Sequence, residues 1–193
     1  QALKAKATRE KILNAVVILI NESGYSSASS TAIAKKAGIT WGAVQHHFGN
    51  KEEILVAVME MARDVYIQSL DQAEINKGTI EERVSHFVDL VWEHYKSDLY
   101  FAFSEIVMAT RGANSKLPLR QIRVNIGLDE HLKRMVDIFE GYDVSQDRLN
   151  EVLRYTHRFL GGFAIDRILE PGMPFEDLHI QRIKDQLLTI IYH

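Results

Sequence analysis

The sequence contains no cysteine, and this absence excludes a disulfide framework and a thiolate zinc site. It also has no apolar run long enough for a membrane span: near its start the longest is AVVILI, at residues 15–20, against the roughly 20 residues that a spanning helix needs. No cleavage pattern of small residues follows this run, so we expect no signal peptide. These absences favour a cytoplasmic protein that has no membrane partner.

Charge is unevenly distributed along the chain, although the net charge is only −3. Residues 1–51 contain seven basic and two acidic side chains, so this segment carries +5 and the remaining residues carry −8. Such asymmetry suggests a basic contact module on an acidic body. The alternative is an ordinary fluctuation of surface charge between segments.

The apolar residues follow a helical period almost throughout. In the first helix, for example, Ile12, Leu13, Val16, Leu19 and Ile20 form one stripe. Ser and Thr residues, Asn50, and the pairs Asn50/Glu53 and Thr79/Glu82 are typical of helix starts, and Gly38 and Gly49 are typical of helix ends. We predict an all-α fold of nine helices, which run through residues 12–22, 31–37, 40–48, from 51 into the seventies, 79–96, 98–110, 118–139, 145–170 and 174–193.

The second and third predicted helices form a helix-turn-helix motif. They are joined by a turn of about three residues that contains Gly38, and Ile39 is expected to anchor this turn. A small core is expected from Ile33, Ala34, Ala37, Ile39, Val44 and Phe48. The side chains that remain outward on the second helix of the motif are Thr40, Trp41, Gly42, Ala43, Gln45 and His46. A helix this short, held by its back face, is suited to enter a DNA major groove.

The run TAIAKKAGITWGAVQHHFGNKEEIL, at residues 31–55, resembles the DNA-binding signature of the TetR family of bacterial transcriptional regulators. The resemblance covers roughly the first 55 residues and implies a DNA-binding domain at 1–50 and a ligand-binding and dimerisation domain at 51–193. It implies phosphate contacts by Ser30, Thr40, Gln45 and Lys51, and places Trp41, Gly42, Ala43 and His46 near base edges. Thr31 completes the expected DNA-binding set. The family usually has tyrosine where this chain has Gln45, whose amide could instead pair with adenine.

Several of these residues also have purely structural interpretations. Trp41 could cover the small core, and His46 could be a solvated side chain. His47, beside Phe48, is interpreted as a packed histidine and not as a base reader.

The acidic body is rich in aromatic and methionine side chains that would surround an effector cavity in the resembled family. Polar residues among them could orient a small molecule. The candidate ligand-binding residues are Trp92, Tyr95, Phe103, Glu105, Met108, Arg111, Asn125, His131 and Phe159. The alternative is that these residues are plain core. No His-Glu-x-x-His or similar spacing indicates a metal site, and no nucleophile and base stand at a recognised catalytic spacing.

The last two predicted helices carry apolar stripes, and Gly161 and Gly162 lie within the longer helix. Glycine is unfavourable inside a helix, so close approach by another helix is the expected compensation. In the resembled family the final two helices form a dimer's four-helix bundle. The expected interface residues are Leu153, Leu160, Gly161, Gly162, Ile183 and Leu187.

The sequence therefore predicts a regulator, expected to be a repressor, that binds a pseudo-palindromic DNA operator as a homodimer and is released by a small-molecule effector. No other cofactor is expected. Two alternatives remain: an all-helical enzyme in which the helix-turn-helix is only scaffold, and a constitutive architectural DNA-binding protein.

Overall fold

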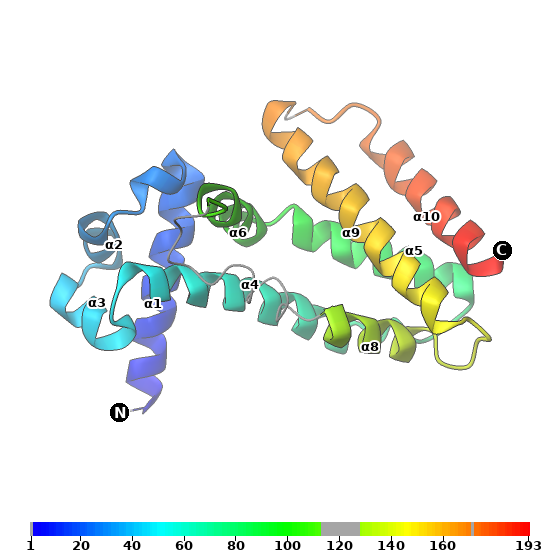
Figure 1. Cartoon of the computed structure of the whole chain (residues 1–193), viewed down its shortest axis with the longest axis horizontal. Helices are drawn as coiled ribbons and strands as arrows, with labels where there is room; N and C mark the ends of the chain where they lie inside the picture. Colours follow the sequence, from blue (N-terminus) through cyan, green and yellow to red (C-terminus); the bar gives the residue numbers. More distant parts are fainter. Residues whose placement is uncertain (1, 113–127, 171) are drawn as a thin grey trace. The chain divides into compact units, whose positions relative to one another are not determined.

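The computed structural model describes residues 2–112, 128–170 and 172–193 (Figure 1). These residues contain nine α-helices and no strand, which confirms the predicted all-α fold. The helices are α1 (Ala2–Ser23), α2 (Ser30–Ala37), α3 (Trp41–Phe48), α4 (Lys51–Gln72), α5 (Ile80–Tyr95), α6 (Asp98–Ala109), α8 (Leu128–Ile138), α9 (Gln146–Leu169) and α10 (Glu176–Tyr192), with a short 3-10 helix, η1 (Tyr25–Ser27). None of these helices is both long and apolar enough to cross a membrane.

The described chain divides into two compact units. The first comprises residues 2–64 and 97–112, which include α1, α2, α3 and α6. The second comprises residues 65–96, 128–170 and 172–193, which include α5, α8, α9 and α10. Helix α4 contributes residues 51–64 to the first unit and 65–72 to the second.

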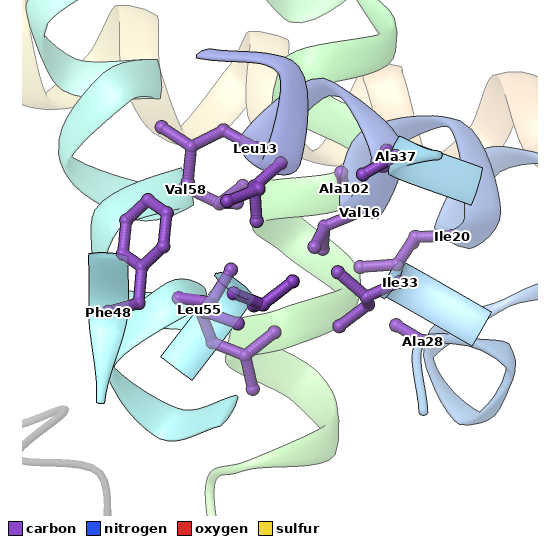
Figure 2. Close-up of a cluster of buried hydrophobic side chains, with 14 of the residues drawn as sticks. Leu13, Val16, Ile20, Ala28, Ile33, Ala37, Phe48, Leu55, Val58 and Ala102 are labelled. Atoms are coloured by element: carbon purple, nitrogen blue, oxygen red, sulfur yellow. The ribbon is translucent and has the colours of Figure 1, made fainter. Parts of the chain in front are cut away.

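The first unit is built around one apolar cluster, in which α1 packs against α2 and α6 (Figure 2). The predicted small core is confirmed for Ile33, Ala34, Ala37, Val44 and Phe48, which are all buried, whereas Ile39 is half-buried at the edge of the cluster. Helix α6 adds Ala102 and Ile106. Burial of this shared core holds α2 and α3, each only eight residues long and too short to be stable alone.

Side-chain caps fix where the helices begin. The Ser29 hydroxyl accepts the Ala32 N–H at the start of α2, and the Thr40 hydroxyl accepts the Ala43 N–H at the start of α3. The Asn50 side chain accepts the Glu53 N–H before α4. A reciprocal capping box of the predicted kind opens α5.

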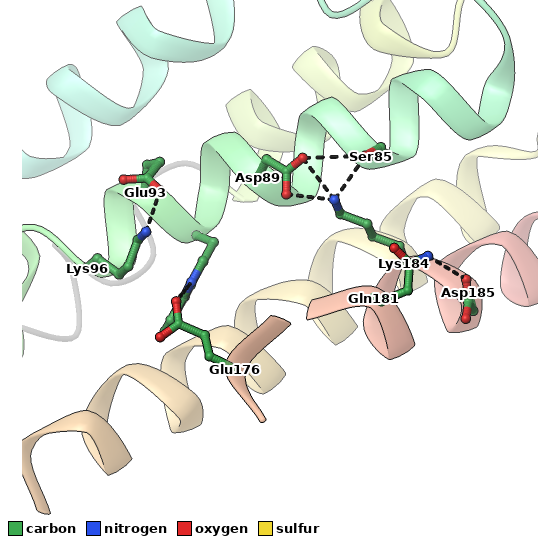
Figure 3. Close-up of polar contacts among 9 residues, drawn as sticks. Ser85, Asp89, Glu93, Lys96, Glu176, Gln181, Lys184 and Asp185 are labelled. Atoms are coloured by element: carbon green, nitrogen blue, oxygen red, sulfur yellow. Dashed lines mark hydrogen bonds and ion pairs between the residues drawn. The ribbon is translucent and has the colours of Figure 1, made fainter. Parts of the chain in front are cut away.

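In the second unit, α5, α9 and α10 pack against one another, and α8 packs against α9. Polar contacts on the flank of this bundle join α5 to α10, where Lys184 bonds Ser85 and forms an ion pair with Asp89 (Figure 3). The Trp92 indole N–H donates to the Glu176 carboxylate at 2.8 Å.

Some predicted details are wrong. The fourth helix is predicted to bury Ile54, Leu55, Val58, Ala62 and Val65, but Val65 is 46% exposed, because the buried stripe advances in steps of four through Val58, Ala62 and Tyr66 to Leu70. Helix α10 begins at Glu176 and not at Pro174, since Phe175 takes a left-handed conformation ahead of it. The predicted start of a helix at Pro118 lies outside the described residues.

Candidate nucleic-acid interface

The turn between α2 and α3 has the geometry of a helix-turn-helix. Gly38 ends α2 with φ 65° and ψ 35°, a left-handed conformation that favours glycine. Its N–H bonds the Lys35 carbonyl, and the Ile39 N–H bonds the Ala34 carbonyl, so the last carbonyls of α2 are satisfied within the turn. Thr40 then caps α3. The motif is therefore fixed by backbone bonds as well as by the core beneath it.

Helix α3 has one buried and one exposed face. Val44 and Phe48 are buried, whereas Gly42, Gln45 and His46 are exposed, as predicted. Ala43 is half-buried. The exposed side chains leave an outward surface that mixes an amide, an imidazole and a glycine.

Trp41 has a mixed environment. It was predicted to point outward, but it is half-buried and packs against the core cluster of the first unit. Part of its ring therefore covers the small core, as the structural interpretation expected, while the rest of the side chain is accessible at the first residue of α3.

The hydroxyl groups beside this surface are placed to meet an anion. Thr40 is exposed, and because its oxygen accepts the Ala43 N–H, its own hydrogen is available to donate to a phosphate. Thr31 is exposed at the start of α2, where its hydroxyl lies 3.2 Å from that of Ser29. Ser30 is half-buried as the first residue of α2.

Lys51 lies half-buried at the first position of α4, with Nζ 5.0 Å from the centroid of the Tyr25 ring. Burial lowers the pKa of the Lys51 ammonium, and the nearby Glu52 carboxylate opposes that shift. The Tyr25 ring limits the orientations that the Lys51 side chain can adopt. No motif in the sequence connects Tyr25 with Lys51.

Arg9, also missed from the sequence, supports the far end of α3. It donates to the His47 carbonyl, and its guanidinium carbon lies 3.9 Å from the centroid of the Phe48 ring. His47 itself is half-buried, which agrees with its interpretation as a packed residue. By contrast, the Lys36 ammonium is engaged in an ion pair with Glu22, so its contribution to a basic surface is reduced.

The candidate ligand-binding residues fall in both units. In the first unit, Phe103 stacks on Tyr100, and the Glu105 carboxylate accepts the Tyr25 N–H at 3.3 Å. Met108 and Arg111 are exposed. Asn125 lies outside the described residues.

In the second unit the remaining candidates form two aromatic groups. Trp92 stacks on Phe163, which contacts the candidate Phe159. The candidates Tyr95 and His131 both contact the His157 ring, Tyr95 through a hydroxyl that lies 2.7 Å from Nδ1. No motif in the sequence singles out His157, which stands at no metal-ligand spacing.

The residues of the predicted dimer interface differ in how far the single chain buries them. Leu153, Leu160, Ile183 and Leu187 are all buried within this single chain, where α9 and α10 pack on each other and on α5. Gly161 is half-buried and Gly162 is exposed. No neighbouring atom lies within 4 Å of where a Cβ of Gly162 would stand.

The outer face of these two helices instead carries a groove of about 360 Å³. Its lining residues are Tyr155, Phe159, Arg182, Ile183, Asp185, Gln186 and Thr189. Farther along α9 and α10, Ile165, Ile168 and Leu178 are exposed apolar side chains.

Comparison with known proteins agrees with the local geometry. Residues 12–58 match the family model described as bacterial regulatory proteins, tetR family. The chain is 29% identical over 136 residues to the fatty acid metabolism regulator protein of Bacillus subtilis, an alignment that covers 68% of this chain and 63% of that one. It is 33% identical over 102 residues to the HTH-type transcriptional regulator UidR of Escherichia coli, covering 53% of this chain and 48% of UidR. The chain thus spans about half to two thirds of the length of these relatives.

Solved structures share the fold across nearly the whole chain. A transcriptional regulator from Rhodococcus sp. Rha1 superposes with a TM-score of 0.72 at 23% identity, covering 95% of both chains. The fatty acid degradation regulator FadR from Bacillus halodurans superposes with a TM-score of 0.65 at 19% identity, covering 93% of this chain and 97% of that one.

Proposed function

We propose, on the premise that this chain belongs to the TetR family of bacterial regulatory proteins, that it is a transcription regulator that reads duplex DNA with α3. The observation that carries the proposal is the two-faced character of α3. Val44 and Phe48 bury one side in the core, and the other side exposes Gly42, Gln45 and His46. A short rigid helix with an outward polar face is the element that helix-turn-helix proteins place in the major groove.

The roles of the surrounding residues follow from their chemistry. Thr40 and Lys51 flank α3 and supply a hydroxyl and an ammonium, which suits them to phosphate oxygens. Gln45 and His46 present groups that can pair with base edges. Gly42 has no side chain, so the DNA backbone or a base edge can approach α3 closely at this position.

We further propose that two copies of the chain assemble through the exposed faces of α9 and α10. This proposal keeps the open position at Gly162 from the sequence prediction and adds Tyr155 and Phe159, which line the groove together with Ile183. A two-fold dimer would present two α3 helices to DNA and would therefore require an inverted repeat.

A small organic effector is proposed to bind within the second unit and to weaken DNA binding, which makes the protein a repressor. Helix α4 supports this coupling because it begins at Lys51, beside α3, and ends with residues 65–72 in the second unit. An effector that shifted this helix would change the spacing of the two α3 helices in a dimer. The two α3 helices must fit major grooves that lie a fixed number of helical turns apart. The dimer therefore loses affinity for DNA when the spacing of these helices changes.

The alternatives differ in how well they are supported. Members of this family are transcription regulators and not enzymes, which argues against the enzyme alternative. A constitutive architectural binder would bind DNA without any response to a ligand. We propose that the protein acts in the cytoplasm, where bacterial DNA lies, and that it needs no cofactor apart from the effector.

Selection from a random duplex library tests the proposal. The protein should enrich a pseudo-palindromic sequence with half-sites about one helical turn apart or a multiple of it. A variant with Gln45→Ala and His46→Ala should lose the enrichment while keeping weak, sequence-independent binding. If the unmodified protein enriches no inverted repeat, the proposal is wrong.

A further inference from the structure

Three imidazole rings and one phenol ring meet in the second unit, where Tyr66 and His131 are buried and His94 and His157 are half-buried. Tyr66 on α4 lies at the centre of this group, with its ring centroid 4.9 Å from those of His94 and His131 and 5.7 Å from that of His157. His131 and His157 stack at 5.4 Å. Four helices, α4, α5, α8 and α9, therefore bring their polar rings to one place inside a unit whose described buried side chains are otherwise almost entirely apolar. We call these four residues the Tyr66 cluster.

Two polar atoms of the Tyr66 cluster have no hydrogen-bond partner among the residues that the structure describes. They are the Tyr66 hydroxyl oxygen and His157 Nε2, and both are buried. Leaving a buried polar group without a partner is costly, so each such group needs an explanation. A ligand that supplies the missing partner is one.

Both atoms are suited to donate. Burial raises the pKa of the Tyr66 hydroxyl, which therefore keeps its proton. The Tyr95 hydroxyl lies 2.7 Å from His157 Nδ1 but 3.4 Å from the His157 carbonyl, so its hydrogen is best directed to Nδ1. This assignment places the imidazole hydrogen on Nε2. The Tyr66 cluster thus presents two donors, on rings 5.7 Å apart.

The charge of the ligand is limited by the surroundings. Burial, and then the neighbouring His131, lower the pKa of His94 to about 4; burial, then His131 and His94, lower that of His157 to about 3. Both rings are therefore neutral near pH 7. No cation belongs to the cluster, and on the adjoining helices Arg63 is paired with Asp64 and Arg134 with Asp71. A bound carboxylate would lack a counter-ion here, and no acidic side chain belongs to the cluster to balance an ammonium group.

The same rings do not form a metal site. Within the described part of the chain, no three His, Asp or Glu side chains are grouped so that they could hold a metal ion. Two donors on neighbouring rings, in a neutral and largely apolar interior, instead match an oxygen that has two lone pairs and no charge.

We propose that the Tyr66 cluster binds the uncharged carbonyl oxygen of a small organic effector, which accepts hydrogen bonds from the Tyr66 hydroxyl and His157 Nε2. This inference rests on the proposed function and specifies its effector: a neutral carbonyl compound with an otherwise apolar body. Organic acids and amines of the same size should be rejected.

Three probes of equal size and different polar groups test the proposal: cyclohexanone, cyclohexanecarboxylate and cyclohexylammonium. Each is titrated at pH 7.5 into protein with isotope-labelled histidine side chains, and the imidazole resonances are followed by NMR. Cyclohexanone should shift the His157 resonances in a saturable way, and the two charged probes should not. The absence of a saturable shift with cyclohexanone, or tighter binding of the carboxylate, would overturn the proposal.

The variant Tyr66→Phe removes only the hydroxyl group. It should weaken cyclohexanone binding about tenfold, which corresponds to the loss of one hydrogen bond, and it should not lower the midpoint of thermal unfolding. Tyr142→Phe, at an exposed tyrosine of the same unit, is the matched control and should leave the affinity unchanged. Full affinity in Tyr66→Phe, or a clear loss of stability, would show that the hydroxyl has a structural role only.

Binding of DNA is measured separately on the same samples. Tyr66→Phe should bind DNA as the unmodified protein does. If the protein selects no DNA sequence but cyclohexanone still binds, the proposed regulatory function fails while the ligand site stands. If DNA is selected but cyclohexanone does not bind, only the ligand site fails.

Discussion

The guanidinium carbon of Arg9 lies 3.9 Å from the centroid of the Phe48 ring, and the same side chain donates to the His47 carbonyl. Arg9 belongs to α1, and Phe48 is the last residue of α3. A single side chain on the scaffold helix therefore covers the anchoring aromatic residue of α3 and satisfies one of the carbonyls at its end. This contact fixes the orientation of α3 on the first unit.

Removing this contact should weaken the first unit. We expect Arg9→Ala to lower the free energy of unfolding by about 1 kcal/mol, the magnitude of a cation–π contact at an accessible site. Urea denaturation measures the change. Lys6→Ala, which removes an exposed cation of the same helix, should change stability by less than about 0.5 kcal/mol. Equal losses in the two variants would argue that Arg9 contributes only through charge.

A substitution at Gly42 can change the affinity for DNA without lowering the stability of the fold. A Cβ at this position would meet only the Thr40 hydroxyl, at 3.9 Å, which is ordinary contact. Gly42→Ala should therefore leave stability unchanged or raise it by up to about 1 kcal/mol, because alanine favours helix.

The same variant should bind the selected duplex about tenfold or more weakly, because a methyl group would keep the DNA from approaching α3. Fluorescence anisotropy measures the affinity. Gly172→Ala, in the loop before α10, is the control and should bind normally. An unchanged affinity in Gly42→Ala would mean that DNA does not approach α3 at this residue.

The helices and the DNA-binding motif could be predicted from sequence because their signals are local. The caps at Thr40 and Thr79 and the left-handed Gly38 act within a few residues, so spacing alone reveals them. Val44 and Phe48 were identified as buried for the same reason, since they follow the helical period.

Contacts between distant parts of the chain could not be predicted in this way. Leu153 and Ile183 belong to apolar stripes, which on isolated helices suggest an interface between copies. In the structure, α9, α10 and α5 pack together and bury both residues within one chain. The Tyr66 cluster combines residues from four helices, and no spacing along the sequence indicates that they meet. Periodicity shows which face of a helix is apolar, but it does not show which other helix covers that face.

The open position at Gly162 makes the proposed dimer testable. No atom lies within 4 Å of where a Cβ would stand at this residue, so Gly162→Leu should not destabilise the monomer fold. It should nevertheless weaken dimerisation if a second copy packs closely against α9. Sedimentation at micromolar concentration should find the unmodified protein dimeric and the variant shifted toward monomer. Gly172→Leu, also at an open position, should remain dimeric. A dimeric Gly162→Leu would place the interface elsewhere.

Stability should fall in mild acid because of the Tyr66 cluster. His94 and His157 have pKa values of about 4 and about 3 in the folded chain, where burial keeps them neutral, against about 6.5 when unfolded. Between those values the unfolded chain binds more protons than the folded chain. The free energy of unfolding should therefore decrease as the pH falls from about 6.5 toward 4, by up to about 1.4 kcal/mol per pH unit for each histidine.

The contribution of one histidine can be isolated by substitution. His94→Phe keeps a ring beside Tyr66 but cannot take up a proton, so it should reduce the slope of stability against pH in this range. Urea denaturation at a series of pH values gives the slope, and His86→Phe, at an exposed histidine, should change it little. An identical slope in His94→Phe and the unmodified protein would refute the assignment.

Sequence-specific DNA binding is the central claim, and a ratio of two dissociation constants tests it directly. Fluorescence anisotropy at 150 mM salt compares the inverted repeat enriched by selection with a scrambled duplex of the same composition. The account predicts that the unmodified protein binds the inverted repeat at least about a thousandfold more tightly. A ratio near one would contradict it, because the outward face of α3 would then contribute charge and shape but no reading of sequence.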